Sequence, residues 1–155
     1  MTDAFSAIGA LNARYARCID DAALSGWPEF FTDRCLYKVT TAANYAAGLE
    51  GALIYADSRA MLVDRVAALA EANIYERHAY RHILGAPFVV GQDAGETRSE
   101  TPFIVVRIMR DGTSDVFASG KYVDVVRFED GDAKLAERIV VCDSSRIDTL
   151  LALPL

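Results

Sequence analysis

The chain has 155 residues, of which 52% are hydrophobic and 25% are charged, and its formal net charge is −6. This length and composition predict one ordinary globular domain over residues 1–155, with a core large enough to fold without disulfides or a structural metal. The acidic balance, with arginines that form no run, argues against the basic surface that a nucleic-acid-binding domain needs.

The beginning of the chain predicts two helices and a strand. Apolar residues recur at steps of three and four over residues 4–24, which is the period of an amphipathic helix. Gly26 suits the end of this helix, and Pro28 suits the first turn of a second, short helix. Residues 33–41 are rich in β-branched and aromatic side chains and predict a strand.

A long connection and a further helix follow. Residues 42–55 contain two glycines and show no clean period, so they predict a long loop, and such loops are usually functional or cover a neighbour. Residues 57–73 predict a helix with Asp57 or Ser58 as its N-cap. Its apolar face consists of Met61, Leu62, Val66 and Leu69.

The second half predicts a meander of antiparallel strands at residues 101–109, 114–128 and 133–145. Asp-Gly pairs lie in both connections and indicate tight hairpins, because both residues can reach positive φ. Alternation in the last strand puts Lys134, Ala136 and Arg138 on one side and Leu135, Glu137 and Ile139 on the other. It is imperfect, which is typical of a curved sheet with bulges.

Helices that precede a strand-rich second half predict an α+β domain. The sheet must cover its apolar face with the helices. A strongly bent antiparallel sheet wrapped on a long N-terminal helix is the cone-shaped, cystatin-like solution. Such a cone leaves a cavity between helices and sheet, the kind of concavity that binds small molecules.

Both histidines lie in the stretch NIYERHAYRHILG, residues 73–85. On a helix, His78 and His82 would lie one turn apart and would be able to share a metal ion. The β-branched and aromatic residues, together with Gly85 and Pro87, favour a strand instead. Residues four apart in a strand are separated by about 13 Å, too far for two imidazoles to converge readily on one ion. We therefore disfavour a metal site and predict that His82 is buried and hydrogen-bonded.

An acid–base pair in the cone is a second interpretation of His82, with Asp33, Tyr15 or Tyr37 as its partner. A general base needs such a hydrogen bond and a tuned pKa. The simpler interpretation is a hydrogen-bonded core or interface histidine, with tyrosines that fill the core. An open cavity with these groups in reach would favour a free-standing isomerase or dehydratase. A cavity filled by Phe, Leu and Trp27 would exclude that enzyme.

The three cysteines, Cys18, Cys35 and Cys142, have no close spacing, so we expect free structural thiols in a reducing cytoplasm. No adjacent histidine or helix start activates any of them as a nucleophile. The N-terminus lacks the features of a signal peptide, and no stretch approaches the roughly 18 apolar residues of a membrane span. These features predict a cytoplasmic protein.

The chain closes with an apolar tail, SSRIDTLLALPL. Its leucines and Pro154 are costly to leave in water, and such tails usually dock on a surface. The surface is either the chain's own sheet or another subunit, and the sequence leaves both open.

Several strings follow one another in an order that resembles the small (β) subunit of Rieske-type aromatic-ring-hydroxylating dioxygenases. They are WPEFFTDRCLYKVT, YADSRAMLVDRV, YRHILG, VFASGKYVDV and LAERIVVCDSSRIDTLLALPL. The likeness covers nearly the whole chain, and the combination is specific although each string alone is weak. NIYERHAYRHILG and VCDSSRIDTLLALPL point to complexes that act on a carboxylated arene such as terephthalate.

The resemblance implies an NTF2-like cone and a non-catalytic structural subunit that trimerises and carries large (α) subunits. The large subunit would hold the Rieske [2Fe-2S] cluster and a mononuclear iron, and a reductase would supply electrons from NAD(P)H. The complex would add O₂ to the arene as a cis-dihydrodiol. Two histidines and three cysteines cannot supply both iron sites.

The resemblance transfers no catalytic, cofactor-binding or metal-binding residue to this chain, and it implies no nucleic-acid or membrane partner. The residues that we single out as candidates for a cavity or an interface are Trp27, Tyr37, Arg81, His82 and Leu155.

Overall fold

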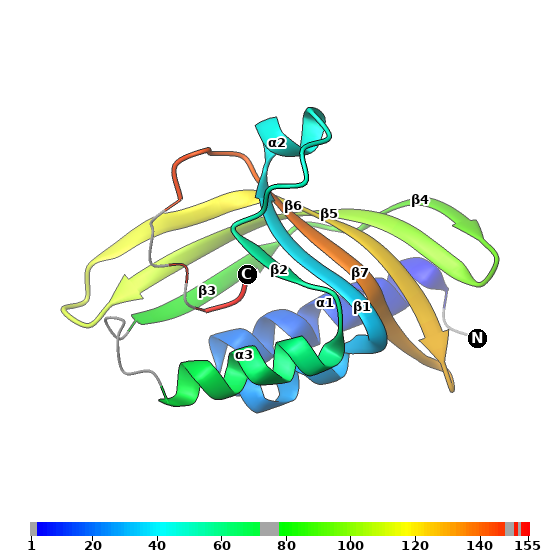
Figure 1. The fold of residues 1–155 in the computed structure, drawn as a ribbon, viewed down its shortest axis with the longest axis horizontal. Coiled ribbons are helices and arrows are strands. Elements are labelled where there is room, and N and C mark those ends of the chain that lie inside the picture. Colours follow the sequence, from blue (N-terminus) through cyan, green and yellow to red (C-terminus); the bar gives the residue numbers. More distant parts are fainter. Residues whose placement is uncertain (1–2, 72–77, 148–150, 152) are drawn as a thin grey trace.

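The computed structural model describes residues 3–71, 78–147, 151 and 153–155. The fold has two layers, a strongly bent sheet and the helices α1 (Ala4–Asp20) and α3 (Arg59–Glu71) on one side of it (Figure 1). The 3-10 helix η1 (Leu24–Phe30) leads from α1 into the first strand. The predicted α+β cone is confirmed.

In the described part of the chain, seven strands form one sheet in the order β2-β1-β7-β6-β5-β3, and β4 pairs with β5. The strands are β1 (Phe31–Thr41), β2 (Ile54–Ala56), β3 (His78–Leu84), β4 (Phe88–Asp93), β5 (Glu96–Met109), β6 (Ser114–Glu129) and β7 (Asp132–Cys142). The predicted meander is confirmed for β5, β6 and β7. The sheet is not wholly antiparallel, because β1 runs parallel to β7. Most of the chain separates these two strands, so no hairpin fixes their relative direction.

Bulges bend the sheet around α1. The register shifts between Val105 and Val106 in the β5–β6 pair, and between Val125 and Val126 in the β6–β7 pair. Each bulge bends its strand and increases the local twist. The second shift also makes the predicted alternation in β7 wrong. Arg138 faces the core and is fully buried, as is Leu135, whereas Glu137 is only partly covered.

The hairpin turns follow their Asp-Gly signals. Asp130 and Gly131 have φ of 52° and 84°, as a tight turn with two left-handed residues requires. In the β5–β6 connection only Gly112, with φ of 90°, is left-handed. A further turn with two left-handed residues, Ala94 and Gly95, joins β4 to β5 and carries no Asp-Gly signal.

Helix α1 begins as predicted but ends early. Asp3 is its N-cap and accepts a hydrogen bond from the Ser6 N–H at 2.8 Å. The helix ends at Asp20 because Ala22 takes a left-handed φ of 58° and the Ala23 N–H bonds back to the Cys18 carbonyl. The assignment of Gly26 to the helix end is therefore wrong. Gly26 and Pro28 both lie inside η1.

The predicted long loop contains structure. Thr41 caps the short helix α2 (Ala42–Ala46), and β2 pairs with β1. After it, Ser58 accepts a hydrogen bond from the Met61 N–H at 3.2 Å, which confirms the predicted N-cap of α3. Of the apolar face predicted for α3, Leu62 is fully buried and Met61 is exposed.

The tail docks on the chain itself. Leu155 is fully buried, and its main-chain oxygen accepts hydrogen bonds from the phenols of Tyr15 in α1 and Tyr37 in β1. Around it the interior of the cone is filled by aromatic side chains, among them Trp27 and Phe31. The structure thus favours the chain's own core over another subunit as the docking surface.

A buried ion pair links two central strands of the sheet, and its arginine also binds α1. The Arg138 guanidinium donates to both Asp124 oxygens, at 2.9 and 2.8 Å, and to Asn12 Oδ1 at 2.5 Å. The rings of Tyr15 and Tyr122 lie on it at 4.3 and 3.9 Å. Burial alone would disfavour the cation, but Asp124 outweighs that effect and raises the pKa of Arg138. Among the described residues, no helix is long and apolar enough to cross a membrane.

Replacing one partner of this pair should lower the free energy of unfolding more than replacing both partners does. Arg138→Leu alone is expected to lower the free energy of unfolding by about 3–5 kcal/mol, because it leaves the Asp124 carboxylate buried and uncompensated. The double variant Arg138→Leu, Asp124→Leu should recover a large part of that loss, since no charge remains to be buried. Urea unfolding at neutral pH measures both. Losses that simply add would contradict the coupling.

Candidate functional site

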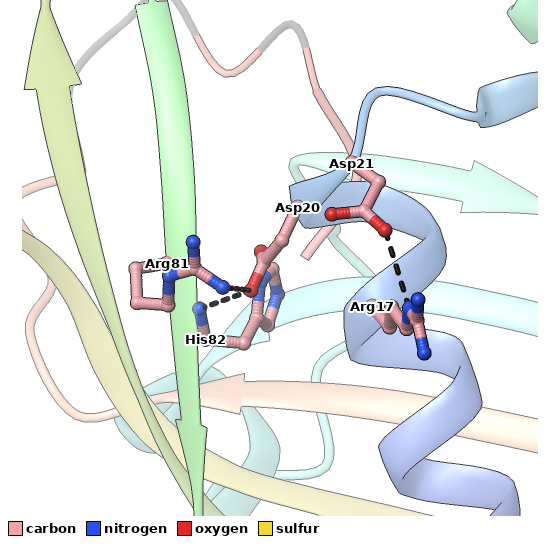
Figure 2. Close-up of polar contacts among 5 residues, drawn as sticks. All are labelled: Arg17, Asp20, Asp21, Arg81 and His82. Carbon is pink, nitrogen blue, oxygen red and sulfur yellow. Dashed lines mark hydrogen bonds and ion pairs between the residues drawn. The ribbon is translucent and has the colours of Figure 1, made fainter.

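The candidate site lies where the end of α1 meets β3 (Figure 2). The sequence places Asp20 in the last turn of α1, and it places Arg81 and His82 side by side in β3. Alternation along β3 sends Tyr80 and His82 inward and leaves Arg81 exposed. The predicted strand is confirmed for residues 78–84, whereas residues 73–77 lie outside the described residues.

Asp20 binds His82 at two points. Its Oδ2 accepts the His82 backbone N–H at 2.9 Å, and its Oδ1 lies 2.7 Å from the imidazole Nδ1. Both side chains are almost completely buried. A carboxylate at a helix C-terminus opposes the helix dipole, so these contacts offset an unfavourable position. The prediction that His82 is buried and hydrogen-bonded is confirmed.

Charged side chains surround the pair. Arg81 Nη1 lies 3.7 Å from Asp20 Oδ2, and the Arg81 side chain is 66% exposed. One turn away, Arg17 pairs with Asp21 at 3.3 Å on the surface of α1. These residues line an open depression of about 580 Å³ between α1 and β3, and Leu84 and Pro87 also line it.

The geometry suits a structural contact better than proton transfer. A general base must reach the proton that it abstracts, directly or through one water. The His82 side chain is 0% exposed, and among the described residues its Nε2 has no hydrogen-bond partner. The pair therefore ties the edge of the sheet to α1.

The predicted acid–base partners of His82 lie elsewhere. Asp33 is exposed and pairs with Arg59, so its assignment as a partner of His82 is wrong. Tyr15 and Tyr37 are fully buried and bind the Leu155 main chain. Trp27 packs edge-on against Tyr37, with ring centroids 5.1 Å apart. This filled interior meets the condition stated above for excluding a free-standing isomerase or dehydratase.

The cysteines are free and not activated. Cys35 and Cys142 are buried, and Cys18 is partly buried. Burial raises the pKa of the Cys142 thiol to about 12, and burial also raises the pKa values of Cys18 and Cys35. A thiol needs a lowered pKa to act as a nucleophile near neutral pH. The Cys18 thiol donates a hydrogen bond to the Ala23 carbonyl at 3.0 Å, and the buried Cys35 and Cys142 sulfurs act as apolar packing groups.

The donor set does not fit the iron groups that the family resemblance implies. A Rieske cluster takes paired cysteine and histidine ligands, and a mononuclear iron takes two histidines and a carboxylate. In the described ranges, no three His, Cys, Asp or Glu side chains lie close enough to hold a metal ion. His82 is committed to Asp20 through Nδ1. We therefore assign no step of iron chemistry to this chain.

Comparison with known proteins identifies the family. The ring hydroxylating beta subunit family matches residues 14–149. The chain belongs to this family. It is 53% identical over 148 residues to the beta 1 subunit of the terminal oxygenase component of terephthalate 1,2-dioxygenase from a Comamonas species, covering 96% of each chain. It is 40% identical to the small subunit of anthranilate 1,2-dioxygenase from Burkholderia cepacia, covering 94% of this chain and 90% of that subunit.

A solved structure supports the same assignment. A beta subunit of the aromatic-ring-hydroxylating dioxygenase class from Novosphingobium aromaticivorans superposes with a TM-score of 0.91 at 39% identity, covering 98% of this chain and 97% of that one. Ring-hydroxylating beta subunits are parts of oxygenase complexes, so this chain is a component of an enzyme.

Sequence reasoning found half of the site of this beta subunit. His82 and Arg81 stand out because they lie in a dense polar string, but Asp20 is one of two adjacent aspartates at the end of a surface helix. The signal that could have found it is its position. Asp20 falls one residue after Ile19, on the buried side of α1, whereas Asp21 points outward.

The two neighbouring aspartates should respond differently to the same change. Asp20→Asn removes the charge that the His82 imidazole and Arg81 contact, so we expect a loss of about 1–3 kcal/mol in the free energy of unfolding. Asp21→Asn, at an exposed ion pair, should change it by less than about 0.5 kcal/mol. Thermal or urea unfolding at pH 7 measures both. Equal effects would show that the Asp20 contact adds nothing.

Proposed function

We propose that this chain is the structural small subunit of a ring-hydroxylating dioxygenase that acts on terephthalate or a similar carboxylated arene. The observation that carries the proposal is the 53% identity, over 96% of both chains, to a beta subunit of terephthalate 1,2-dioxygenase. In this proposal a separate large subunit holds the Rieske [2Fe-2S] cluster and the mononuclear iron and performs the cis-dihydroxylation. A reductase passes it electrons from NAD(P)H.

The role of the small subunit is to fix the positions of the large ones. It does so as a trimer of single NTF2-like domains, each formed by residues 1–155, in the cytoplasm. Free thiols, two of them buried, agree with a reducing compartment. The filled cone and the enclosed His82 agree with a role in shape rather than in chemistry.

An exposed apolar segment supports assembly. The α2–β2 arm, residues 42–56, projects from the body of the fold (Figure 1) and ends in the edge strand β2. Four of its large apolar side chains are between 41% and 56% exposed: Tyr45, Leu49, Leu53 and Tyr55. It contains Glu50 and no basic residue. Exposed apolar groups that gather in one place mark interaction surfaces, so we place a subunit contact there.

Of the five residues singled out as cavity or interface candidates, Arg81 is the one that the surface exposes. The other four are buried within the chain: Trp27, Tyr37, His82 and Leu155. They cannot contact another subunit directly and contribute to an interface only by packing under the surface residues that form it. Arg81 stands at the rim of the depression between α1 and β3, where a neighbouring subunit can reach it.

Iron is expected only in preparations that contain the large subunit. Co-expressed with the large subunit of a terephthalate dioxygenase, the chain is expected to purify in a complex that contains iron and oxygenates terephthalate when a reductase and NAD(P)H are supplied. The chain expressed alone should contain no stoichiometric iron and turn over no arene. Metal analysis and native mass spectrometry test both. Stoichiometric iron in the chain expressed alone would contradict the proposal.

The arm should be needed for assembly but not for folding. Leu49→Asp with Leu53→Asp is expected to leave the circular dichroism spectrum and melting temperature nearly unchanged, because both side chains are already exposed. It should prevent formation of the full complex, since it puts two charges into an apolar contact. Phe5→Asp, at a similarly exposed site on α1, is the matched control. If the unaltered chain, the arm variant and the Phe5→Asp control all formed complexes of equal mass, the arm would be ruled out as an interface.

A further inference from the structure

A second exposed apolar surface lies on the outer face of the sheet. Ile83 in β3 pairs directly with Ile104 in β5, and in the next row Val106 in β5 pairs with Val116 in β6. We name these four residues the edge patch. Ile83, Ile104 and Val116 are 58%, 42% and 65% exposed. Exposed apolar side chains that gather in one place mark interaction surfaces, so the edge patch is a candidate contact.

Strand alternation keeps the edge patch out of the core. Its neighbours in sequence, His82 in β3 and Phe103 and Val105 in β5, are buried. Successive side chains of a strand point to opposite faces of the sheet, so Ile83 and Ile104 point away from the core. Helices α1 and α3 lie on the core side (Figure 1), so neither of them covers the edge patch.

The edge patch and the α2–β2 arm lie at opposite edges of the sheet. In the strand order β2-β1-β7-β6-β5-β3, the arm leads into β2 at one end, and the edge patch spans β6, β5 and β3 at the other. Four strand spacings separate β2 from β5, which is about 19 Å along the sheet. The two surfaces are therefore separate, and one chain carries both.

Charge also distinguishes the two surfaces. The arm contains Glu50 and no basic residue. Arg81, whose side chain is 66% exposed, lies opposite Val106 in the β3–β5 pair and so borders the edge patch. Opposite charges beside an apolar contact favour the correct partner and fix its orientation. An arm therefore suits the edge patch better than it suits a second arm, which would bring two acidic segments together.

The trimer of the proposed function needs two different surfaces. In a closed ring of three copies the contacts are head-to-tail, so a surface of one copy meets a different surface of the next. We propose that the arm of each copy docks on the edge patch of the neighbouring copy, with Glu50 beside the neighbour's Arg81. This assignment rests on the trimer of the proposed function and identifies the two surfaces that form it.

The patch variant of the full chain, Ile83→Asp with Ile104→Asp, should fold but form no trimer, because it puts two charges into an apolar contact. The matched control, Phe5→Asp with Val63→Asp, adds the same two charges on α1 and α3, at residues that are 52% and 50% exposed. Circular dichroism checks the fold, and sedimentation gives the mass of the assembly. A patch variant that forms trimers as readily as the control would overturn the proposal.

A milder variant covers the case in which the aspartates disturb the strands, since aspartate is poorly suited to a strand. Ile83→Thr with Ile104→Thr keeps β-branched side chains and removes apolar contact area. It should raise the protein concentration at which trimers dissociate by roughly tenfold or more. An unchanged dissociation concentration would likewise overturn the proposal.

Mixing two defective versions of the chain shows which surfaces meet. The arm variant, Leu49→Asp with Leu53→Asp, keeps an intact edge patch, and the patch variant keeps an intact arm. Neither should assemble alone, but an equimolar mixture should form a dimer with one copy of each, because one intact contact remains. The two variants have equal masses, so one carries a heavy-nitrogen label for native mass spectrometry. The mixture is measured at high protein concentration, because a single contact binds more weakly than a closed ring.

The outcomes separate this contact from the proposed function. If the unaltered chain forms trimers and an active complex with the large subunit, but the two variants form no mixed dimer, only the contact between arm and edge patch is overturned. If the unaltered chain forms no trimer, the trimer of the proposed function is overturned together with this contact.

Discussion

The ion pair of Arg138 and Asp124 is the contact on which the layered structure depends. It lies between two strands of the sheet, and its guanidinium is enclosed by the rings of Tyr15 and Tyr122. Through Asn12, which bonds both Arg138 and Thr101, it also binds α1 to β5. A buried charge is tolerated only with its partner and its hydrogen bonds in place. Helix position, strand register and side-chain orientation must therefore be correct together.

The strands of this sheet could be read from the sequence, but their exact register could not. The turn at Asp130–Gly131 can be recognised in the sequence. If the two strands paired from this turn without a bulge, Asp124 would lie opposite Glu137, which would place two like charges side by side. The bulge moves the pairing by one residue, so that Asp124 faces Arg138. Periodicity shows that a strand exists; a single inserted residue leaves no periodic trace, and here it decides which charge enters the core. The unfavourable pairing of Asp124 with Glu137 was the available clue.

The site could likewise be predicted only in part: the strand and the burial of His82 could be, and its partner could not. Local patterning indicated that His82 lies in a strand and is buried, because alternation and flanking residues are local properties. Its partner Asp20 is 62 residues away in the chain, and the end of α1 depends on the left-handed Ala22, a conformation that the residue type does not announce. The docking of the tail depends likewise on Tyr15 and Tyr37, which are distant in sequence. Composition showed that the tail must be covered and left open what covers it.

The polar groups of the interior are directed at the chain itself. A cone of this shape has room for a ligand, and an enzyme would aim its histidine, phenols and guanidinium at that ligand. In the described interior His82 binds Asp20, Arg138 binds Asp124, and Tyr15 and Tyr37 bind Leu155. Each of these contacts joins two of the three parts α1, the tail and the sheet, or joins one strand to the next. The chemistry that would serve catalysis elsewhere fixes the shape of this chain, and a fixed shape is what a subunit needs if it is to hold its partners at set distances.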